Sequence, residues 1–370
     1  MEKEKLREGY TTGACATAAT KAALCALITG RKQKEATIML PIGREVTFPI
    51  VSCEIEKDRA SATVVKDGGD DPDVTHGASI VATVCWTEEG IHIDGGEGVG
   101  RATKPGLPIP VGEAAINPVP RQMMTDVARH LLTEHRLTRG VRIIISVPNG
   151  EEIAKKTLNA RLGIVGGISI LGTRGIVVPF STSAYRASIV RALEVAVACG
   201  CDHVVLTTGG RSETYAMKQY PHLKEEAFIE MGDFVGFTLK QCKRLRIQTV
   251  SLVGMMGKFS KVAQGVMMVH SKSAPVDFQF LAEVAKQAGA STPLIEAVKQ
   301  ANTASQVGDM MYEAGYLSFF DLLCDYCCQH ALREVNGGMT VETTLYTLKG
   351  QQLGRAVRND GANEINRNWS

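Results

Sequence analysis

Two glycine-rich segments follow runs of apolar residues that are typical of buried strands. The segment TTGG follows HVVL, and the segment GMMGK follows TVSLV. In parallel sheets, ligands bind at the carboxyl ends of the strands, and glycine lets backbone N–H groups approach a ligand closely. We therefore predict that a nucleoside-containing ligand is held by Thr207, Thr208, Gly209, Gly210, Gly254 and Gly257.

Neither segment contains a nucleotide-binding fingerprint. The pattern GxGxxG is missing, and GMMGK has two residues between its glycines where the P-loop has four. Each segment alone is therefore also explained by a tight turn from a strand into a helix. Two of them in successive strand–helix units strengthen the binding prediction, because their ends would be neighbours in one sheet. A third glycine-rich loop lies at 163–167, with further glycines up to residue 175.

Four basic residues fall in or just after the predicted strand-to-helix connections: Arg174, Arg186, Arg211 and Lys258. Each of them alone is an ordinary surface charge. Grouped at one sheet edge, they would bind carboxylates, arginine through paired hydrogen bonds. We predict that they bind the substrate.

The segment KDGGDDPDVTHG (66–77) carries four aspartates within seven positions. Aspartate, glycine and proline favour turns for local backbone reasons, so a solvated turn is one interpretation. Crowded carboxylates can also raise one another's pKa or ligate a hard cation, although the spacing is not that of an EF-hand. Asp70 and Asp71 are our candidates for a catalytic proton acceptor. His76, as an isolated histidine, is more typical of a structural position.

A cysteine-rich stretch near the C-terminus reads CDYCCQH and contains Cys324, Cys327, Cys328 and His330. A structural zinc site normally needs four well-spaced ligands. Only one CxxC is present here, and it lies inside a helical pattern from about 307 to 333. We therefore interpret these cysteines as small buried residues and predict no metal ligands in the chain.

The overall composition limits the partners. The chain has 370 residues, which suggests about two domains, and 41 basic residues against 39 acidic ones. This near-balance gives no broad basic field for nucleic acid or an anionic membrane. The charged N-terminal residues do not resemble a signal peptide, no apolar run reaches ~18 residues, and ten cysteines without a secretion signal indicate reduced thiols. We expect a cytoplasmic protein.

The first half of the chain predicts one helix, then short strands, then another helix. Thr11 or Thr12 can cap a helix that extends to Leu27 and stops at Gly30. Strand-like runs follow at 37–40, 45–55, 60–66, 79–86 and 91–94, and Pro118 opens an amphipathic helix to about Glu134.

From about residue 141, strands and helices alternate, which predicts a parallel sheet. The strand-like runs are at 141–147, 175–180, 203–208 and 247–253, and residues 278–333 are mostly helical. We predict an α/β protein with a mixed α+β character. It should have an N-terminal domain at 1–180 with an antiparallel or mixed sheet, a parallel-sheet domain at 181–350, and a polar tail at 351–370.

Several long segments resemble one family in order and in sequence. GYTTGACATAATKAAL (9–24), KDGGDDPDVTHG (66–77), INPVPR (116–121), RLGIVGGISILGTRGIV (161–177), TTGGRSE (207–213), GDFVG (232–236) and GMMGKFSKVAQG (254–265) are similar to blocks of the CbiD family. Members of that family are cobalt-precorrin-5B methyltransferases, which modify carbon 1 of the corrin ring. Two departures are Arg174, where the family has threonine, and Met256, where it more often has proline.

The resemblance implies a fold, a reaction and ligands. The fold would combine an α/β module related to a permuted ribosomal-S5-type fold with a four-stranded parallel sheet. S-adenosylmethionine would be the co-substrate, and cobalt would belong to the substrate only. The product would be cobalt-precorrin-6A in anaerobic cobalamin biosynthesis. We expect the macrocycle in a crevice between the two domains. A homo-oligomer and transient contacts with other corrin-pathway enzymes are both compatible with the sequence.

Two competing interpretations stay open. A phosphotransferase or a nicotinamide enzyme would use the same glycine-rich segments, although this chain lacks the nucleotide-binding fingerprints of such enzymes. A corrinoid carrier would bind the macrocycle without the methyl donor.

Overall fold

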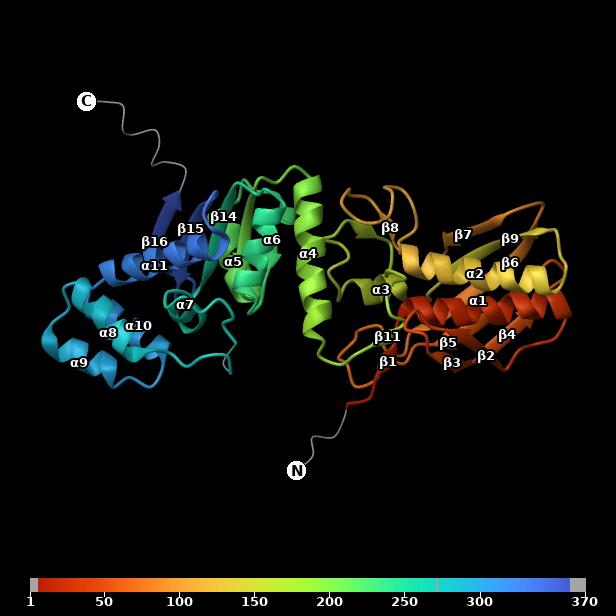
Figure 1. Cartoon of the computed structure of the whole chain (residues 1–370), viewed down its shortest axis with the longest axis horizontal. Coiled ribbons are helices and arrows are strands. Elements are labelled where there is room, and N and C mark those ends of the chain that lie inside the picture. Colours follow the sequence, from red (N-terminus) through yellow and green to blue (C-terminus); the bar gives the residue numbers. More distant parts are fainter. Residues whose placement is uncertain (1–5, 271, 360–370) are drawn as a thin grey trace. The chain divides into compact units, whose positions relative to one another are not determined.

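The computed structural model describes residues 6–270 and 272–359, and it divides into two compact units (Figure 1). The first unit ends at Thr182 and the second begins at Ser183. Both units combine helices with sheets, so the chain is an α/β protein of mixed topology.

The first unit is built on one apolar helix, α1 (Thr12–Thr29). The Thr11 hydroxyl caps it by accepting a hydrogen bond from the Ala14 amide at 3.2 Å, and Gly30 ends it in the left-handed conformation. Among the described residues, α1 alone has the length and hydropathy of a membrane span, but 72% of it is buried inside the protein. It is a core helix.

The helix α2 (Pro118–Glu134) lies beside α1, and α1 crosses strands of the sheet behind it (Figure 1). The sheet has the order β4-β5-β6-β9-β7 and is antiparallel except where β7 pairs parallel to β9. A separate hairpin joins β2 to β3. These strands are β2 (Glu35–Met39), β3 (Glu45–Pro49), β4 (Ser52–Ile55), β5 (Arg59–Val65), β6 (Ser79–Thr87), β7 (Ile91–Gly95) and β9 (Gly140–Ser146).

Two short antiparallel pairs complete the first unit. β1 (Gly9–Tyr10) pairs with β11 (Ile176–Val177), and β8 (Arg101–Ala102) pairs with β10 (Ile164–Val165). β9 is followed by one short helix, α3 (Gly150–Ala154). The prediction that the parallel sheet begins at about residue 141 is wrong, because β9 pairs antiparallel with β6 in the first unit and β11 contributes two residues to a local ribbon.

The second unit contains the predicted parallel sheet, with the order β13-β12-β14-β15-β16. β13 (Phe228–Glu230), β12 (His203–Thr207), β14 (Thr249–Met255) and β15 (Thr340–Tyr346) are parallel, and β16 (Gln352–Asn359) returns antiparallel. The predicted polar tail from 351 onward is therefore wrong up to Asn359, because β16 pairs along β15; residues 360–370 lie outside the described residues.

Helices cover both faces of this sheet, which explains the continuous apolar runs of its strands. Val204 and Leu206 join a large core, whereas Val205 faces a smaller cluster beneath α5. The helices are α4 (Thr182–Ala198), α5 (Gly210–Gln219), η1 (Glu225–Ala227), α6 (Val235–Arg244), α7 (Met256–Val262), α8 (Phe278–Gln287), α9 (Thr292–Lys299), α10 (Ala304–Glu313) and α11 (Ser318–Val335). The helical pattern predicted from 307 to 333 is thus interrupted, at Gly315, which has φ 79°.

Candidate functional site

The two predicted glycine-rich segments meet at the carboxyl edge of the parallel sheet in the second unit. β12 and β14 are adjacent, with Thr207 opposite Val253. Beyond these strand ends is a hollow of about 410 Å³. It is lined by residues of both turns, of α10 and of the turn after β15: Thr208, Gly209, Gly210, Arg211, Ser212, Met255, Gly257, Lys258, Ser305 and Leu348. The fold therefore brings together two turns that lie about fifty residues apart in the sequence.

The amino end of α5 opens onto this hollow. Gly209 is its N-cap, and no side chain caps the helix. Ser212 instead holds the preceding turn, because its hydroxyl accepts from the Thr208 amide at 3.2 Å and donates to the Gly209 carbonyl at 2.8 Å. A side chain at Gly210 would meet nothing within 4 Å. An uncapped helix amino end beside open space suits an anionic group.

Lys258 connects the turns around the hollow. Its Nζ donates to the Thr208 carbonyl at 3.2 Å and forms an ion pair with Asp233 Oδ1 at 3.0 Å. Asp233 follows β13, so one lysine links the ends of three parallel strands. Lys258 lines the hollow, but its charge already has a partner. Its observed contacts organise the turns.

Two of the predicted ligand-binding residues do not line the hollow. Thr207 is fully buried at the end of β12, and among the described residues its hydroxyl has no hydrogen-bond partner. Gly254 is buried within β14, and a Cβ atom there would lie 2.0 Å from the ring of Phe259. The lack of a side chain at Gly254 therefore serves the packing of α7 onto the strand, and its contact with a ligand stays a prediction. Gly257, where a Cβ would meet nothing within 4 Å, lines the open space instead.

A second hollow of about 430 Å³ adjoins the first and shares Met255, Ser305 and Leu348 with it. We call the two together the edge groove. The second hollow adds residues that the sequence analysis did not single out, among them Asp309, Tyr312 and Tyr346. Ser305, Asp309 and Tyr312 are spaced i, i+4 and i+7 on α10, so they share one helix face. That spacing could have pointed to this helix face, but these residues lie far along the chain from any glycine-rich turn.

The turn after β15 forms another wall of the edge groove. The Tyr215 hydroxyl of α5 donates to the Leu348 carbonyl at 2.8 Å, and the Thr347 hydroxyl accepts from the amides of Lys349 and Gln351. The ring of Tyr215 also contacts that of Tyr346, with centroids 5.3 Å apart. These contacts fix the turn against α5.

The four predicted basic residues are divided between the two units. Arg211 and Lys258 line the first hollow. Arg186, on α4, places its guanidinium 4.1 Å from the centre of the Phe237 ring. Arg174 is exposed in a loop of the first unit. Arg211 and Lys258 therefore share one hollow at the sheet edge, and substrate binding by all four residues stays a prediction.

The aspartates of residues 66–77 bind neighbouring backbone and basic groups of the first unit. Asp67 pairs with Arg7 through two hydrogen bonds and accepts from the Gly69 amide, and the Arg7 contact first of all lowers the pKa of Asp67 to about 2. Asp70 Oδ2 accepts from the Arg7 amide at 2.6 Å. Asp71 Oδ1 accepts from the amide of Phe180 at 2.9 Å, where the backbone has φ 53°.

Lys66 and Asp73 form a buried pair at the base of the same segment. The side chain of Lys66 is 1% exposed, and its Nζ donates to Asp73 Oδ2 at 2.6 Å. Burial alone would raise the pKa of Asp73, but hydrogen bonds from Lys66 and Thr75 outweigh it and lower that pKa. His76 Nδ1 accepts from the Gly68 amide at 3.0 Å, a structural contact. The segment is a cross-linked turn.

The comparisons with known proteins decide the family. The family model described as CbiD matches residues 1–179, and the one described as CbiD, C-terminal domain, matches residues 268–357. The chain belongs to the CbiD family.

Several relatives of this chain share one name. A protein from Geobacillus sp. (strain WCH70) named cobalt-precorrin-5B C(1)-methyltransferase is 75% identical, over 97% of this chain and 98% of its own. A protein of that name from Priestia megaterium is 66% identical, over 96% and 98%. The crystal structure of a cobalamin biosynthesis protein (cbiD) from Archaeoglobus fulgidus is 31% identical, covering 72% of this chain and 83% of that one with a TM-score of 0.40.

The family's glycine-rich block at 161–177 has a packing role. A Cβ atom at Gly167 would lie 2.1 Å from the carbonyl oxygen of Gly98, and one at Gly172 would lie 2.3 Å from the Thr11 hydroxyl. Thr12, in the family's first block, accepts from the Leu171 amide and donates to the Ser169 carbonyl. Gly172 lets the loop lie against the start of α1, and Gly167 lets it lie against the backbone at Gly98.

The cysteine-rich stretch lies on α11, where Cys324, Cys327 and Cys328 are fully buried. Burial raises the pKa of each thiol. Within residues 6–270 and 272–359, no three His, Cys, Asp or Glu side chains are placed to hold a metal ion. The three cysteines belong to the core of the second unit.

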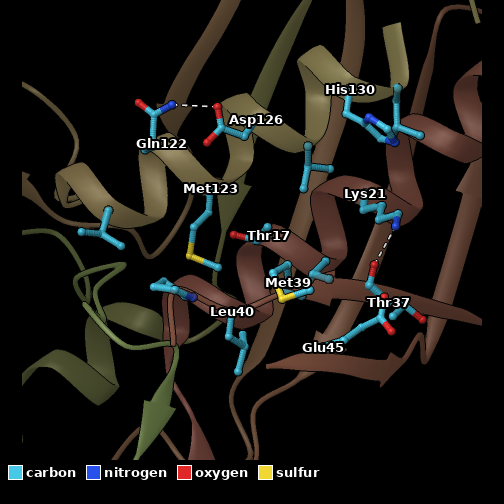
Figure 2. A pocket seen from close by; sticks show the side chains of 15 residues that line it. Thr17, Lys21, Thr37, Met39, Leu40, Glu45, Gln122, Met123, Asp126 and His130 are labelled. Carbon is cyan, nitrogen blue, oxygen red and sulfur yellow. Dashed lines mark hydrogen bonds between the residues drawn. The ribbon is translucent and has the colours of Figure 1, made fainter. Parts of the chain in front are cut away.

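The first unit has a hollow of its own, of about 620 Å³, between α1, α2 and the β2–β3 hairpin. Figure 2 shows Lys21 directed at the Thr37 carbonyl, 2.6 Å away, and Gln122 hydrogen-bonded to Asp126. Its walls are mostly apolar, and Glu45 and Asp126 add negative charge. This lining offers less to an anionic ligand than the edge groove does.

Proposed function

We propose that this chain is a cobalt-precorrin-5B C(1)-methyltransferase of cobalamin biosynthesis. Relatives that bear this name are 66–75% identical and extend over nearly its whole length. The substrate is a small molecule, a cobalt-containing corrin precursor, and the cobalt belongs to that substrate. All ten cysteines are free, which supports a reducing compartment, the cytoplasm.

S-adenosylmethionine is the methyl donor in this proposal, and the edge groove is its site. The observation that carries the assignment is the meeting of the turns after β12 and β14 around one hollow at the carboxyl edge of parallel strands. That edge is where open α/β sheets bind ligands. The amino end of α5 and Arg211 supply positive potential for the donor's carboxylate.

Methyl transfer requires mainly that the donor and the ring carbon are held in line. The sulfonium methyl carbon bonds to carbon 1 of the ring as its bond to sulfur breaks, the electron pair stays on sulfur, and the ring loses a proton. Holding the reactants in line can supply about 7–11 kcal/mol of the barrier. Lys258 contributes by linking the turns after β12, β13 and β14, so that the groove keeps one shape.

Asp70 and Asp71 are the proposed acceptors of the proton that the ring loses. Each carboxylate accepts one backbone hydrogen bond, from Arg7 and Phe180 respectively. An asparagine Oδ1 can accept the same bond but cannot take up the proton. Substitution by asparagine therefore separates the two roles.

The donor site is tested by filling the groove without disturbing the fold. Gly210→Val and Gly257→Val add side chains where a Cβ meets nothing within 4 Å. We expect each to weaken S-adenosylhomocysteine binding at least about tenfold in calorimetry, with an unchanged melting temperature. Lys218→Ala, an exposed change at the far end of α5, is the control. Wild-type affinity in both valine variants would exclude the groove as the donor site.

Side-by-side thermal shifts separate the alternatives. The proposal expects S-adenosylmethionine to raise the melting temperature and ATP and NAD to leave it unchanged, because the nucleotide fingerprints are missing. A shift with ATP or NAD alone would favour a phosphotransferase or a nicotinamide enzyme. A shift with the corrin precursor alone would favour a carrier.

A further inference from the structure

We propose that S-adenosylmethionine lies across both hollows of the edge groove, with its adenosine in the second hollow and its ribose hydroxyls donating to Asp309. This inference rests on the proposed methyl donor. It adds the orientation of the ligand and the residue that recognises the ribose, neither of which the glycine-rich turns indicate.

Among the described residues, the Asp309 carboxylate has no basic side chain paired with it. It lines the second hollow from α10 and is exposed. Within residues 6–270 and 272–359, no hydrogen bond or ion pair joins it to another side chain. An ionised carboxylate only accepts hydrogen bonds, and a vicinal diol offers it two donors. Such charge-assisted bonds are about twice as strong as neutral ones.

The surroundings of Asp309 suit a flat aromatic base. Tyr312 lies one turn further along the same face of α10 and is 37% exposed, and Tyr346 and Met256 add further apolar lining. Gly308 allows this arrangement, since a Cβ there would lie 2.9 Å from the Met256 side chain and would push α10 away from α7. Stacking of a base on an aromatic side chain contributes to binding in many nucleotide sites.

Charge decides the direction of the ligand. The first hollow has Arg211, Lys258 and the amino end of α5, whereas in the second the charge of Lys349 is offset by Asp309, so the first better matches the methionine carboxylate. The reverse orientation would place that carboxylate beside Asp309, where like charges repel. Met255, Ser305 and Leu348 line both hollows. They mark the junction at which the sulfonium would sit.

The experiment compares two ligands against three proteins by titration calorimetry. The ligands are S-adenosylhomocysteine and its 2′,3′-dideoxyribosyl analogue, and the proteins are the full wild-type chain, Asp309→Asn and Glu313→Gln. Glu313 is the matched control, because it is an exposed carboxylate one turn along α10 that does not line the groove. We expect Asp309→Asn to bind S-adenosylhomocysteine about tenfold or more weakly. The dideoxy analogue should bind all three proteins equally.

The other outcomes show which of the two proposals fails. Wild-type affinity for S-adenosylhomocysteine in Asp309→Asn would overturn the assignment of Asp309 and leave the donor site standing. Equal losses for both ligands, or an equal loss in Glu313→Gln, would also overturn it, because the effect would not depend on the hydroxyls. A wild-type chain that binds neither ligand would refute the proposed donor and this inference with it.

Discussion

The aspartate-rich segment at 66–77 and the glycine-rich turns after β12 and β14 look alike as sequence, since both are short and broken by glycine. Their structures differ. In the first unit, Asp67, Asp70 and Asp71 accept hydrogen bonds from Arg7, Gly69 and Phe180. In the second unit, Gly210 and Gly257 border open space, where a Cβ atom would meet nothing within 4 Å.

The difference teaches that partners matter more than residue type. Polar groups that neighbouring residues already satisfy stabilise the fold, whereas backbone and side chains around an unfilled hollow are free to meet a ligand. Four predictions test this contrast, from the largest expected effect to the smallest.

Lys66→Met should destabilise the first unit most. It removes the partner of Asp73 and leaves a largely buried carboxylate unpaired, which costs about 3 kcal/mol in the free energy of unfolding, at the lower end of the range for buried pairs because Asp73 is 20% exposed. Urea unfolding of the full chain measures it. Lys57→Met, at an exposed position, should change stability by less than about 0.5 kcal/mol. Equal effects of the two variants would contradict the structural role of the pair.

Asp71→Asn asks whether the acidic segment also does chemistry. Asparagine can keep the bond to the Phe180 amide, so the melting temperature should not change. If Asp71 takes up the proton from the ring, turnover with bound substrate should fall about a hundredfold, a typical loss for a general base. Transfer of labelled methyl groups to cobalt-precorrin-5B measures it. Full turnover would leave Asp71 with a turn-forming role only.

Gly254→Ala and Gly257→Ala compare two glycines of one turn. The alanine Cβ at 254 would overlap the Phe259 ring, so we expect a loss of about 1–3 kcal/mol in the free energy of unfolding. At 257 the Cβ has room, and stability should stay within about 0.5 kcal/mol of wild type. Thermal and urea unfolding give both values. The reverse order would contradict the placement of these glycines.

Lowering the pH should affect the two units in different ranges. Burial lowers the pKa of His203 and of His330 in the second unit, so below about pH 6.5 the unfolded chain takes up protons that the folded chain refuses, and stability falls. In the first unit, Asp67 has its pKa lowered to about 2, mainly by Arg7, so its contribution is lost only between about pH 4 and 2.

Hydrogen exchange, pulse-labelled at one fixed pH after equilibration at pH 7 or 5.5, would resolve the two units. Peptides of the second unit should lose protection first. His203→Gln should reduce that loss, because the histidine no longer titrates. Equal protection of both units at pH 5.5 would contradict this order.

The sequence determined the parts whose signals are local. The ends of α1 follow from the Thr11 cap and from Gly30, and α2 begins at Pro118 as predicted. The turns after β12 and β14 were also predictable, because a buried apolar run predicts the strand and the glycine after it predicts where the strand ends. β16 was not, because a polar edge strand such as QLGRAVRN is defined by its pairing with β15.

Only the tertiary structure decided which residues share a site. It placed Asp309 and Tyr312 of α10 beside turns about fifty and a hundred residues earlier, buried Gly254 beneath Phe259, and assigned Arg174 and Arg211 to different units. The physical reason is that spacing along the chain encodes which face of a helix or strand a side chain occupies. The neighbour opposite that face is chosen by packing across the whole unit.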